Sequence, residues 1–102
     1  MQPQELLKRM KSTRPPVLLD VRSGLEFKSG HISGAIHSPL FKILLRLAQI
    51  PSDKGTELVV TCEHGPRAQL AKSLLGAFGY QNVSLLEGHM AAWRQAARPQ
   101  EK

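Results

Sequence analysis

Three short runs of apolar and β-branched residues recur along the chain, and each is followed by residues at helical spacing. The runs are Val17–Val21, Glu57–Thr61 and Val83–Leu86. Runs of this length and composition are typical of strands that are buried on both faces. Strands that alternate with helices form parallel sheets, because a right-handed crossover returns each helix over a sheet face. The pattern therefore predicts an α/β fold, with a four- to five-stranded parallel sheet and helices on both faces.

Five helices are predicted around these strands, over Pro3–Met10, Gly24–Ser29, Pro39–Ile50, Gln69–Phe78 and Met90–Ala97. A further short strand is expected over Ala35–His37. Ser23 and Glu26 have the spacing of a capping box at the start of the second helix. Gly30 and Gly79 follow helical stretches and are expected to act as left-handed C-caps.

The Pro39–Ile50 stretch is strongly apolar, with only a narrow polar stripe. Such a stretch suits either contact with a partner or membrane, or a core helix that covers one sheet face. We favour the core helix. The last residues, Arg98–Lys102, are polar and are expected to form a frayed tail.

The length of 102 residues predicts one domain, covering residues 1–102. Cys62 is the only cysteine, so no internal disulfide can form. The sequence shows no signal peptide and no apolar stretch of membrane-spanning length. These features favour a reducing compartment, and we expect a cytoplasmic protein that does not associate with membranes.

The formal net charge is +6, which raises the question of nucleic-acid binding. However, the basic residues are scattered from Lys8 to Lys102, and the few aromatic residues do not interleave with them. We therefore expect no nucleic-acid partner. A basic surface of this kind instead favours small anionic substrates.

Cys62 lies between the second predicted strand and a helix, in a loop that includes Gly65 and Pro66. In open α/β sheets, ligands bind at the carboxyl ends of strands. Gly65 permits a sharp turn, and Pro66 suits the first helical position because it has no N–H group. Cysteine attacks as a thiolate, which is favoured near helix N-termini and cations. We therefore interpret Cys62 as a nucleophile, although free cysteines are also common as small buried hydrophobic residues.

The loop also has the features of an anion-binding site. The backbone N–H groups of His64, Gly65, Arg67 and Ala68 can surround the sulfur or a bound anion. A cation at the position of Arg67 opposes the helix dipole, so it indicates an anionic occupant. Glu63 would disfavour a thiolate if it faced the sulfur, and we expect it to point outward or toward a basic neighbour. His64 either contacts a substrate or lies on the rim.

Three polar residues outside the loop are interpreted as structural. Asp20 lies near the end of the first predicted strand, where a buried carboxylate needs a partner, and Arg22 is close by. His31 and His37 fit no standard zinc spacing, and a second cysteine is lacking. We expect neither a metal nor a cofactor.

Taken together, these residues resemble the rhodanese family of sulfurtransferases. The segments that resemble its first signature are Leu19–Arg22, Glu26–Phe27 and Gly30–His37. The segment Cys62–Ala68 is similar to the active-site loop of the family, and Leu85, Gly88 and Trp93 are similar to its closing motif. His89 stands where the family more usually has the second glycine of a pair.

The resemblance implies a persulfide mechanism of sulfur transfer, in which Cys62 takes sulfur from a donor such as thiosulfate. A thiophilic acceptor, such as cyanide, a thiol or a sulfur-accepting protein, would then remove it. Substrate binding would fall to the loop residues, which are Glu63, His64, Gly65, Pro66, Arg67 and Ala68. Structural support would come from Asp20, Arg22, Glu26 and His31.

The spacing of the loop distinguishes sulfur transfer from phosphate chemistry. Cys62 and Arg67 are separated by four residues, whereas the related phosphatases resemble a pattern with five, whose wider ring fits a tetrahedral phosphate. Two alternatives remain: a non-catalytic or regulatory module that uses this fold to bind a partner, and a phosphatase or arsenate-type enzyme. The intact cysteine disfavours the first, and the short loop disfavours the second.

Overall fold

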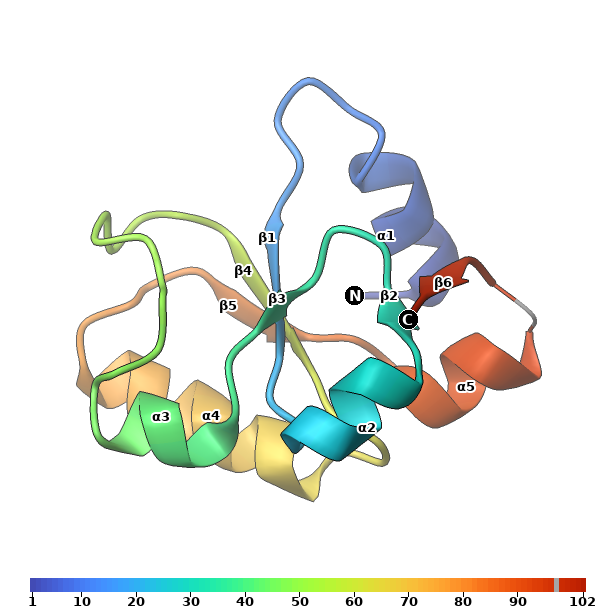
Figure 1. The fold of residues 1–102 in the computed structure, drawn as a ribbon. Coiled ribbons are helices and arrows are strands. Elements are labelled where there is room, and N and C mark those ends of the chain that lie inside the picture. Colours follow the sequence, from blue (N-terminus) through green and yellow to red (C-terminus); the bar gives the residue numbers. More distant parts are fainter. Residues whose placement is uncertain (97) are drawn as a thin grey trace.

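Four parallel strands form the central sheet of the computed structural model, which describes residues 1–96 and 98–102. Their order across the sheet is β3 (Ile36–His37), β1 (Val17–Asp20), β4 (Leu58–Thr61) and β5 (Val83–Leu85). All three neighbouring pairs are parallel (Figure 1). The predicted α/β class and the parallel sheet are therefore confirmed, with four strands.

Helices cover both faces of this sheet. Because side chains alternate along a strand, Leu19 and Val60 face one way, and Leu18 and Val59 face the other. The first pair packs in a cluster with α3 (Leu40–Leu44) and α4 (Pro66–Ala77). The second pair packs with α1 (Pro3–Arg9) and α5 (His89–Gln95). Both faces of the sheet are thereby removed from water.

The helix α2 (Gly24–Ser29) lies beyond the carboxyl end of β1, on the same side of the molecule as the start of α4 (Figure 1). Its predicted capping box is confirmed: the Ser23 hydroxyl accepts the Glu26 N–H, and the Glu26 carboxylate accepts the Ser23 N–H at 3.2 Å. Gly30 does end this helix, but with φ +152° and ψ 129° it lies outside the left-handed helical region that we predicted. Arg22 donates to the Gly30 carbonyl, which directs this extended turn.

Gly79 follows the last turn of α4, as predicted, and adopts a positive φ of +100°. Its N–H donates to the Gly76 carbonyl, and the N–H of Tyr80 donates to that of Leu75, each at 3.0 Å. These two bonds form a Schellman motif.

The prediction of a long core helix over Pro39–Ile50 is wrong. The helix α3 spans only Leu40–Leu44, and Arg46, with φ +59°, lies in the turn that follows. Ile43 is 1% exposed, whereas four other large apolar side chains are 58–65% exposed, namely Phe41, Leu44, Leu45 and Leu47. The reason is geometric. Only one side of this short helix and of the turn after it packs against α4 and the sheet, so the apolar side chains on the other sides stay exposed.

The prediction of a frayed tail is also wrong. Within the last residues, β6 (Gln100–Glu101) pairs antiparallel with β2 (His31–Ile32). The indole N–H of Trp93 donates to the Pro99 carbonyl at 2.8 Å. Backbone pairing and this bond hold a polar segment that shows no apolar pattern.

The last helix begins one residue earlier than predicted and ends at Gln95, while the predicted end at Ala97 lies outside the described residues. None of the described helices has the length and apolar character needed to cross a membrane.

Two adjacent apolar residues of α3 test this arrangement. We expect Ile43→Ala to lower the free energy of unfolding by about 2–5 kcal/mol, because it leaves a cavity in the core. Leu44→Ala removes a side chain that is 58% exposed, and we expect a change within about 0.5 kcal/mol. Urea denaturation measures both, and equal losses in the two variants would contradict the short, one-sided α3.

Candidate active site

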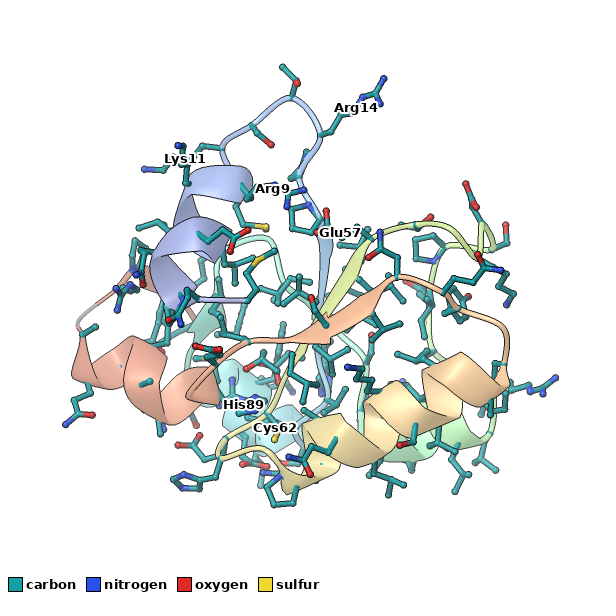
Figure 2. The ribbon with its side chains drawn as sticks, turned by 180° about the vertical axis from the view of Figure 1, so that it is seen from behind. Arg9, Lys11, Arg14, Glu57, Cys62 and His89 are labelled. Atoms are coloured by element: carbon teal, nitrogen blue, oxygen red, sulfur yellow. The ribbon has the colours of Figure 1, made fainter. Side chains whose placement is uncertain are left out.

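The thiol of Cys62 lies at the carboxyl end of β4, directly before α4 (Figure 2). The residue is 1% exposed, and its Sγ accepts the Gly65 N–H at 3.0 Å. Gly65 has φ +131°, a conformation that side-chain-bearing residues rarely adopt. This conformation turns the loop back so that a backbone N–H points at the sulfur.

The start of α4 carries backbone N–H groups that have no acceptor within the helix. Gly65 is the N-cap and Pro66 the first helical residue, as predicted. The N–H groups of Arg67 and Ala68 belong to the first turn, where an α-helix offers no acceptor of its own. Of the four N–H groups that we expected to surround the sulfur, Gly65 alone donates to Sγ in the part of the chain that the structure describes. The roles of the others toward a substrate stay predictions.

Arg67 has a partner that the sequence analysis did not identify. Its guanidinium donates to both oxygens of Glu26 in α2, at 2.6 and 2.9 Å. Glu26 therefore supplies an anion that accounts for a cation at this helix start. Hydrogen bonding to Glu26 raises the pKa of Arg67, and the charges of Cys62 and Asp20 add smaller contributions. The same bond lowers the pKa of Glu26 to about 2, against the opposing effect of burial.

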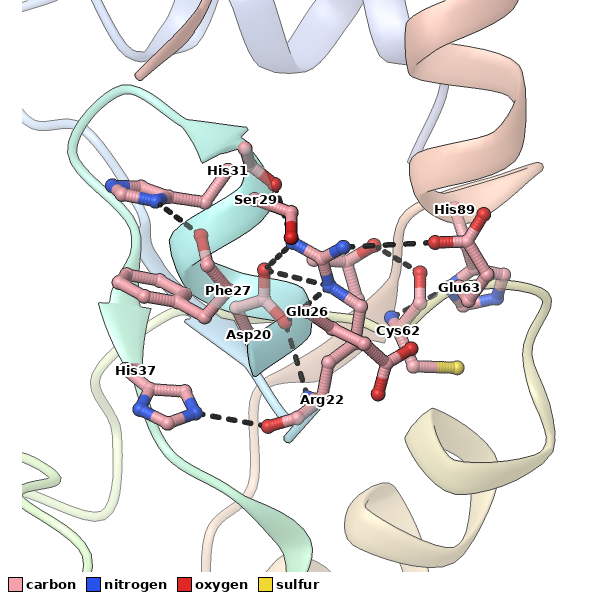
Figure 3. Close-up of polar contacts among 12 residues, drawn as sticks. Asp20, Arg22, Glu26, Phe27, Ser29, His31, His37, Cys62, Glu63 and His89 are labelled. Carbon is pink, nitrogen blue, oxygen red and sulfur yellow. Dashed lines mark hydrogen bonds and ion pairs between the residues drawn. The ribbon is translucent and has the colours of Figure 1, made fainter. Parts of the chain in front are cut away.

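Asp20 and Arg22 form a buried ion pair at the end of β1 (Figure 3). The guanidinium meets both oxygens of Asp20, with the shortest contact at 2.8 Å. Arg22 also donates to the Gly30 carbonyl at 2.8 Å and lies 3.6 Å from the carboxylate of Glu63. One side chain thus connects β1, the end of α2 and the residue next to Cys62.

Glu63 points toward basic neighbours, as expected, because its carboxylate pairs with Arg22 and with Arg94 of α5. Its negative charge is thereby balanced by two cations rather than directed at the sulfur. His64 is exposed on the loop. Whether either residue binds a substrate stays a prediction.

His31 and His37 pack on the two sides of the Phe27 ring, with ring centroids 3.7 and 4.6 Å away. Nδ1 of His31 lies 2.9 Å from the Phe27 carbonyl, and Nε2 of His37 lies 2.9 Å from the Arg22 carbonyl. Both histidines therefore hydrogen-bond to the main chain, as predicted. Among the described residues, His, Cys, Asp and Glu side chains form no group of three that could hold a metal ion.

The structure adds His89 to the site, which sequence reasoning did not select. Its Nδ1 accepts the backbone N–H of Cys62 at 3.3 Å. Burial lowers the pKa of His89, and the nearby charge of His64 adds to this effect. The one signal in the sequence that pointed to His89 was its position, where the family more usually has the second glycine of a pair.

The fold and the loop define an α/β protein with a single thiol at the carboxyl edge of a parallel sheet. A family model described as a Rhodanese-like domain matches residues 2–96. The chain therefore belongs to the rhodanese-like family, and the resemblance found in its motifs is confirmed.

Curated relatives cover most of this chain. A protein named sulfurtransferase from Allochromatium vinosum is 31% identical over 96 residues, which are 94% of this chain and 88% of the relative. Thiosulfate sulfurtransferase GlpE from Pseudomonas savastanoi is 36% identical over 85 residues, 83% of this chain and 77% of the relative. Protein slr1261 of Synechocystis sp. is 33% identical over 96 residues, which are 94% of this chain. The matched region spans about half (52%) of that relative's length.

Solved structures show the same architecture. The Alr3790 protein from Anabaena sp. matches 99% of this chain and 81% of its own, with a TM-score of 0.88 and 29% identity. A rhodanese-related protein from Thermoplasma volcanium matches 99% of this chain and 95% of its own, with a TM-score of 0.83 and 25% identity. The predicted rhodanese-like fold is confirmed.

The buried ion pair predicts a large loss of stability when one partner is neutralised. We expect Asp20→Asn to lower the free energy of unfolding by about 3–5 kcal/mol, because it removes the main partner of the buried Arg22 charge and leaves only the more distant Glu63, at 3.6 Å. Glu57→Gln is the matched control, since it breaks a partly exposed pair with Arg9 and should cost about 0–1 kcal/mol. Urea denaturation distinguishes them, and a loss below about 1 kcal/mol for Asp20→Asn would contradict the interpretation.

The Glu26–Arg67 pair predicts a pH-dependent stability. Because the pKa of Glu26 falls from 4.5 to about 2 on folding, the pair stabilises the protein fully above about pH 4.5. This contribution is lost as the pH falls toward 2. The side chains of Arg67 and Glu26 are 39% and 34% exposed, so water screens the pair. We therefore expect it to contribute about 1 kcal/mol to the free energy of unfolding at pH 7.

Glu26→Gln tests this prediction, because it keeps a capping-box residue while it removes the charge. The stability difference between wild type and variant, from urea denaturation, should shrink between pH 4.5 and 2. Glu87→Gln, at an exposed carboxylate, is the control. A difference that stays constant over this pH range would exclude the ion pair as its source.

Proposed function

We propose that this protein is a sulfurtransferase that carries sulfane sulfur as a persulfide on Cys62. One observation carries the proposal most directly: a lone thiol, at a strand end and before a helix start, accepts a backbone N–H from its own loop. Support comes from the family and from relatives named sulfurtransferase and thiosulfate sulfurtransferase.

The first step loads the sulfur. The Cys62 thiolate attacks the outer sulfur of an anionic donor such as thiosulfate. A sulfur–sulfur bond forms to Cys62, the sulfur–sulfur bond within thiosulfate breaks, and sulfite leaves with the electron pair. The exchange needs no further oxidant, because the sulfane sulfur passes from one sulfur nucleophile to another.

The second step transfers the sulfur from the Cys62 persulfide to an acceptor. A nucleophilic acceptor, either cyanide or a thiolate, attacks the outer sulfur of the persulfide. The new bond forms at the acceptor, which leaves as thiocyanate or as a new persulfide, and Cys62 is released as a thiolate. The two half-reactions form a ping-pong cycle. A thiolate on a sulfur-accepting protein would serve as the acceptor in the same way.

The backbone of the loop would bind the donor. N–H groups from His64 to Ala68, apart from Pro66, offer hydrogen bonds to its negative charge. Arg67 would contribute positive potential while it remains paired with Glu26. Asp20, Arg22, Glu26 and His31 would keep this edge of the sheet in place through the contacts described above.

The alternative is a non-catalytic module that binds a partner with the same fold. The presence of Cys62 and the Gly65 bond to its sulfur favour the enzyme. A single cysteine that must stay reduced between turnovers also fits a cytoplasmic location.

Intact mass spectrometry tests the proposal. After treatment with thiosulfate and removal of excess donor, we expect wild type to gain the mass of one sulfur atom, and Cys62→Ser to gain none. The adduct should disappear on addition of cyanide, with release of thiocyanate. Cys62→Ser should also abolish thiosulfate:cyanide sulfur transfer. An unmodified wild-type mass after treatment with several sulfane donors would refute the proposal, and binding of a partner unaffected by Cys62→Ser would favour the alternative.

A further inference from the structure

The first turn of α5 contacts both backbone polar groups of Cys62. His89 accepts the Cys62 N–H through Nδ1 at 3.3 Å, and the Met90 N–H donates to the Cys62 carbonyl at 3.0 Å. The next N–H, of Ala91, donates to the Glu63 carbonyl at 3.2 Å. The main chain at the thiol is therefore held by residues that follow it by almost thirty positions in the sequence.

His89 is the only side chain that hydrogen-bonds to the backbone N–H of Cys62 within the described residues. The residue is 7% exposed, and Figures 2 and 3 show its ring beside Cys62. Because Nδ1 accepts a hydrogen bond, the neutral ring carries its proton on Nε2. Burial and the charge of His64 lower the pKa of His89, which favours this neutral form.

The opposite edge of the ring lies against Gly65. A Cβ atom placed on Gly65 would stand 3.2 Å from Nε2 and 3.4 Å from Cδ2 of His89. Gly65 is the residue whose N–H donates to the sulfur. One imidazole thus contacts the loop on both sides of the thiol, at the backbone of Cys62 and at Gly65.

The backbone of His89 is unusual. Its φ is +53°, in the left-handed region, directly after Gly88 with φ +73°. Glycine adopts this conformation freely, whereas it is uncommon for residues with a Cβ, among which Asn, Asp and His tolerate it best. The chain thus places an imidazole in a backbone conformation that favours glycine, and uncommon conformations of this kind concentrate at functional sites.

We propose that His89 is a positioning residue for the nucleophile: it fixes the Cys62 main chain through Nδ1, next to Gly65, whose N–H donates to the sulfur. This inference rests on the proposed sulfur transfer. Its effect is to keep Sγ and the Gly65 N–H aligned as sulfur arrives and leaves. Small displacements of reacting groups lower turnover strongly, even where substrate binding is preserved.

Two variants separate the imidazole from the backbone strain. Both His89→Gly and His89→Asn suit a left-handed conformation, so both should fold. Asn also carries an oxygen at the position of Nδ1, which can accept the Cys62 N–H, whereas Gly carries none. Gln95→Ala, at the exposed far end of α5, is the control.

In steady-state thiosulfate:cyanide assays, we expect His89→Gly to lower kcat by about 10- to 100-fold with KM for thiosulfate changed less than about twofold. We expect His89→Asn to keep kcat within about threefold of wild type, and Gln95→Ala to match wild type. A Gly variant with wild-type kcat, an Asn variant as slow as Gly, or a loss confined to KM would each overturn the positioning role. If His89→Gly does not fold, His89→Ala, which also lacks an acceptor for the Cys62 N–H, takes its place: a tenfold loss of kcat supports the positioning role, and wild-type kcat overturns it.

A second measurement does not depend on sulfur transfer. With 15N-labelled cysteine, the single cysteine yields one backbone amide signal, whose hydrogen exchange reports the bond to Nδ1. Exchange should be faster in His89→Gly than in wild type and should be restored toward wild type in His89→Asn. Unchanged exchange in His89→Gly would overturn the inference. Absence of sulfur transfer in wild type, with this exchange pattern intact, would refute the proposed function while leaving the His89 contact established.

Discussion

The buried ion pair between Asp20 and Arg22 is the interaction on which the carboxyl edge of the sheet depends. Removing two charges from water is expensive, and the loss is offset only when each charge meets good partners. Here the guanidinium satisfies Asp20, the Gly30 carbonyl and, at longer range, Glu63. These contacts join three chain segments that are distant in sequence. One arginine therefore links the Cys62 loop, through its ion pair with Glu63, to the end of β1 and to the turn after α2.

Features that arise from neighbouring residues were predictable from the sequence. The three strand runs follow from apolar, β-branched composition, and their alternation with helices implies a parallel sheet. The capping box of Ser23 and Glu26 needs only a spacing of three residues. The Cys62 loop is likewise local, because a strand end, Gly65 and Pro66 together define a turn into a helix. Such features could be placed without knowledge of the rest of the fold.

Features that depend on distant segments were not predictable in this way. Arg67 finds Glu26 41 residues away, and only the fold brings them together. The exposure of Leu44 is set by the surface that α4 and the sheet can offer to α3, which no periodicity encodes. The pairing of β6 with β2 lacks an apolar pattern altogether, and His89 meets the Cys62 N–H only because the fold starts α5 beside the loop. In each case, contacts between segments that are distant in the sequence decide the local structure.

The isolation of Cys62 has a practical consequence. Since the 102-residue chain holds one cysteine and that cysteine is almost fully buried, every thiol reagent reports on a single site. With only 1% of Cys62 exposed, a bulky thiol reagent such as a maleimide can react only when the loop opens. Its labelling rate is therefore a direct measure of loop opening, obtained on the native sequence without an introduced probe.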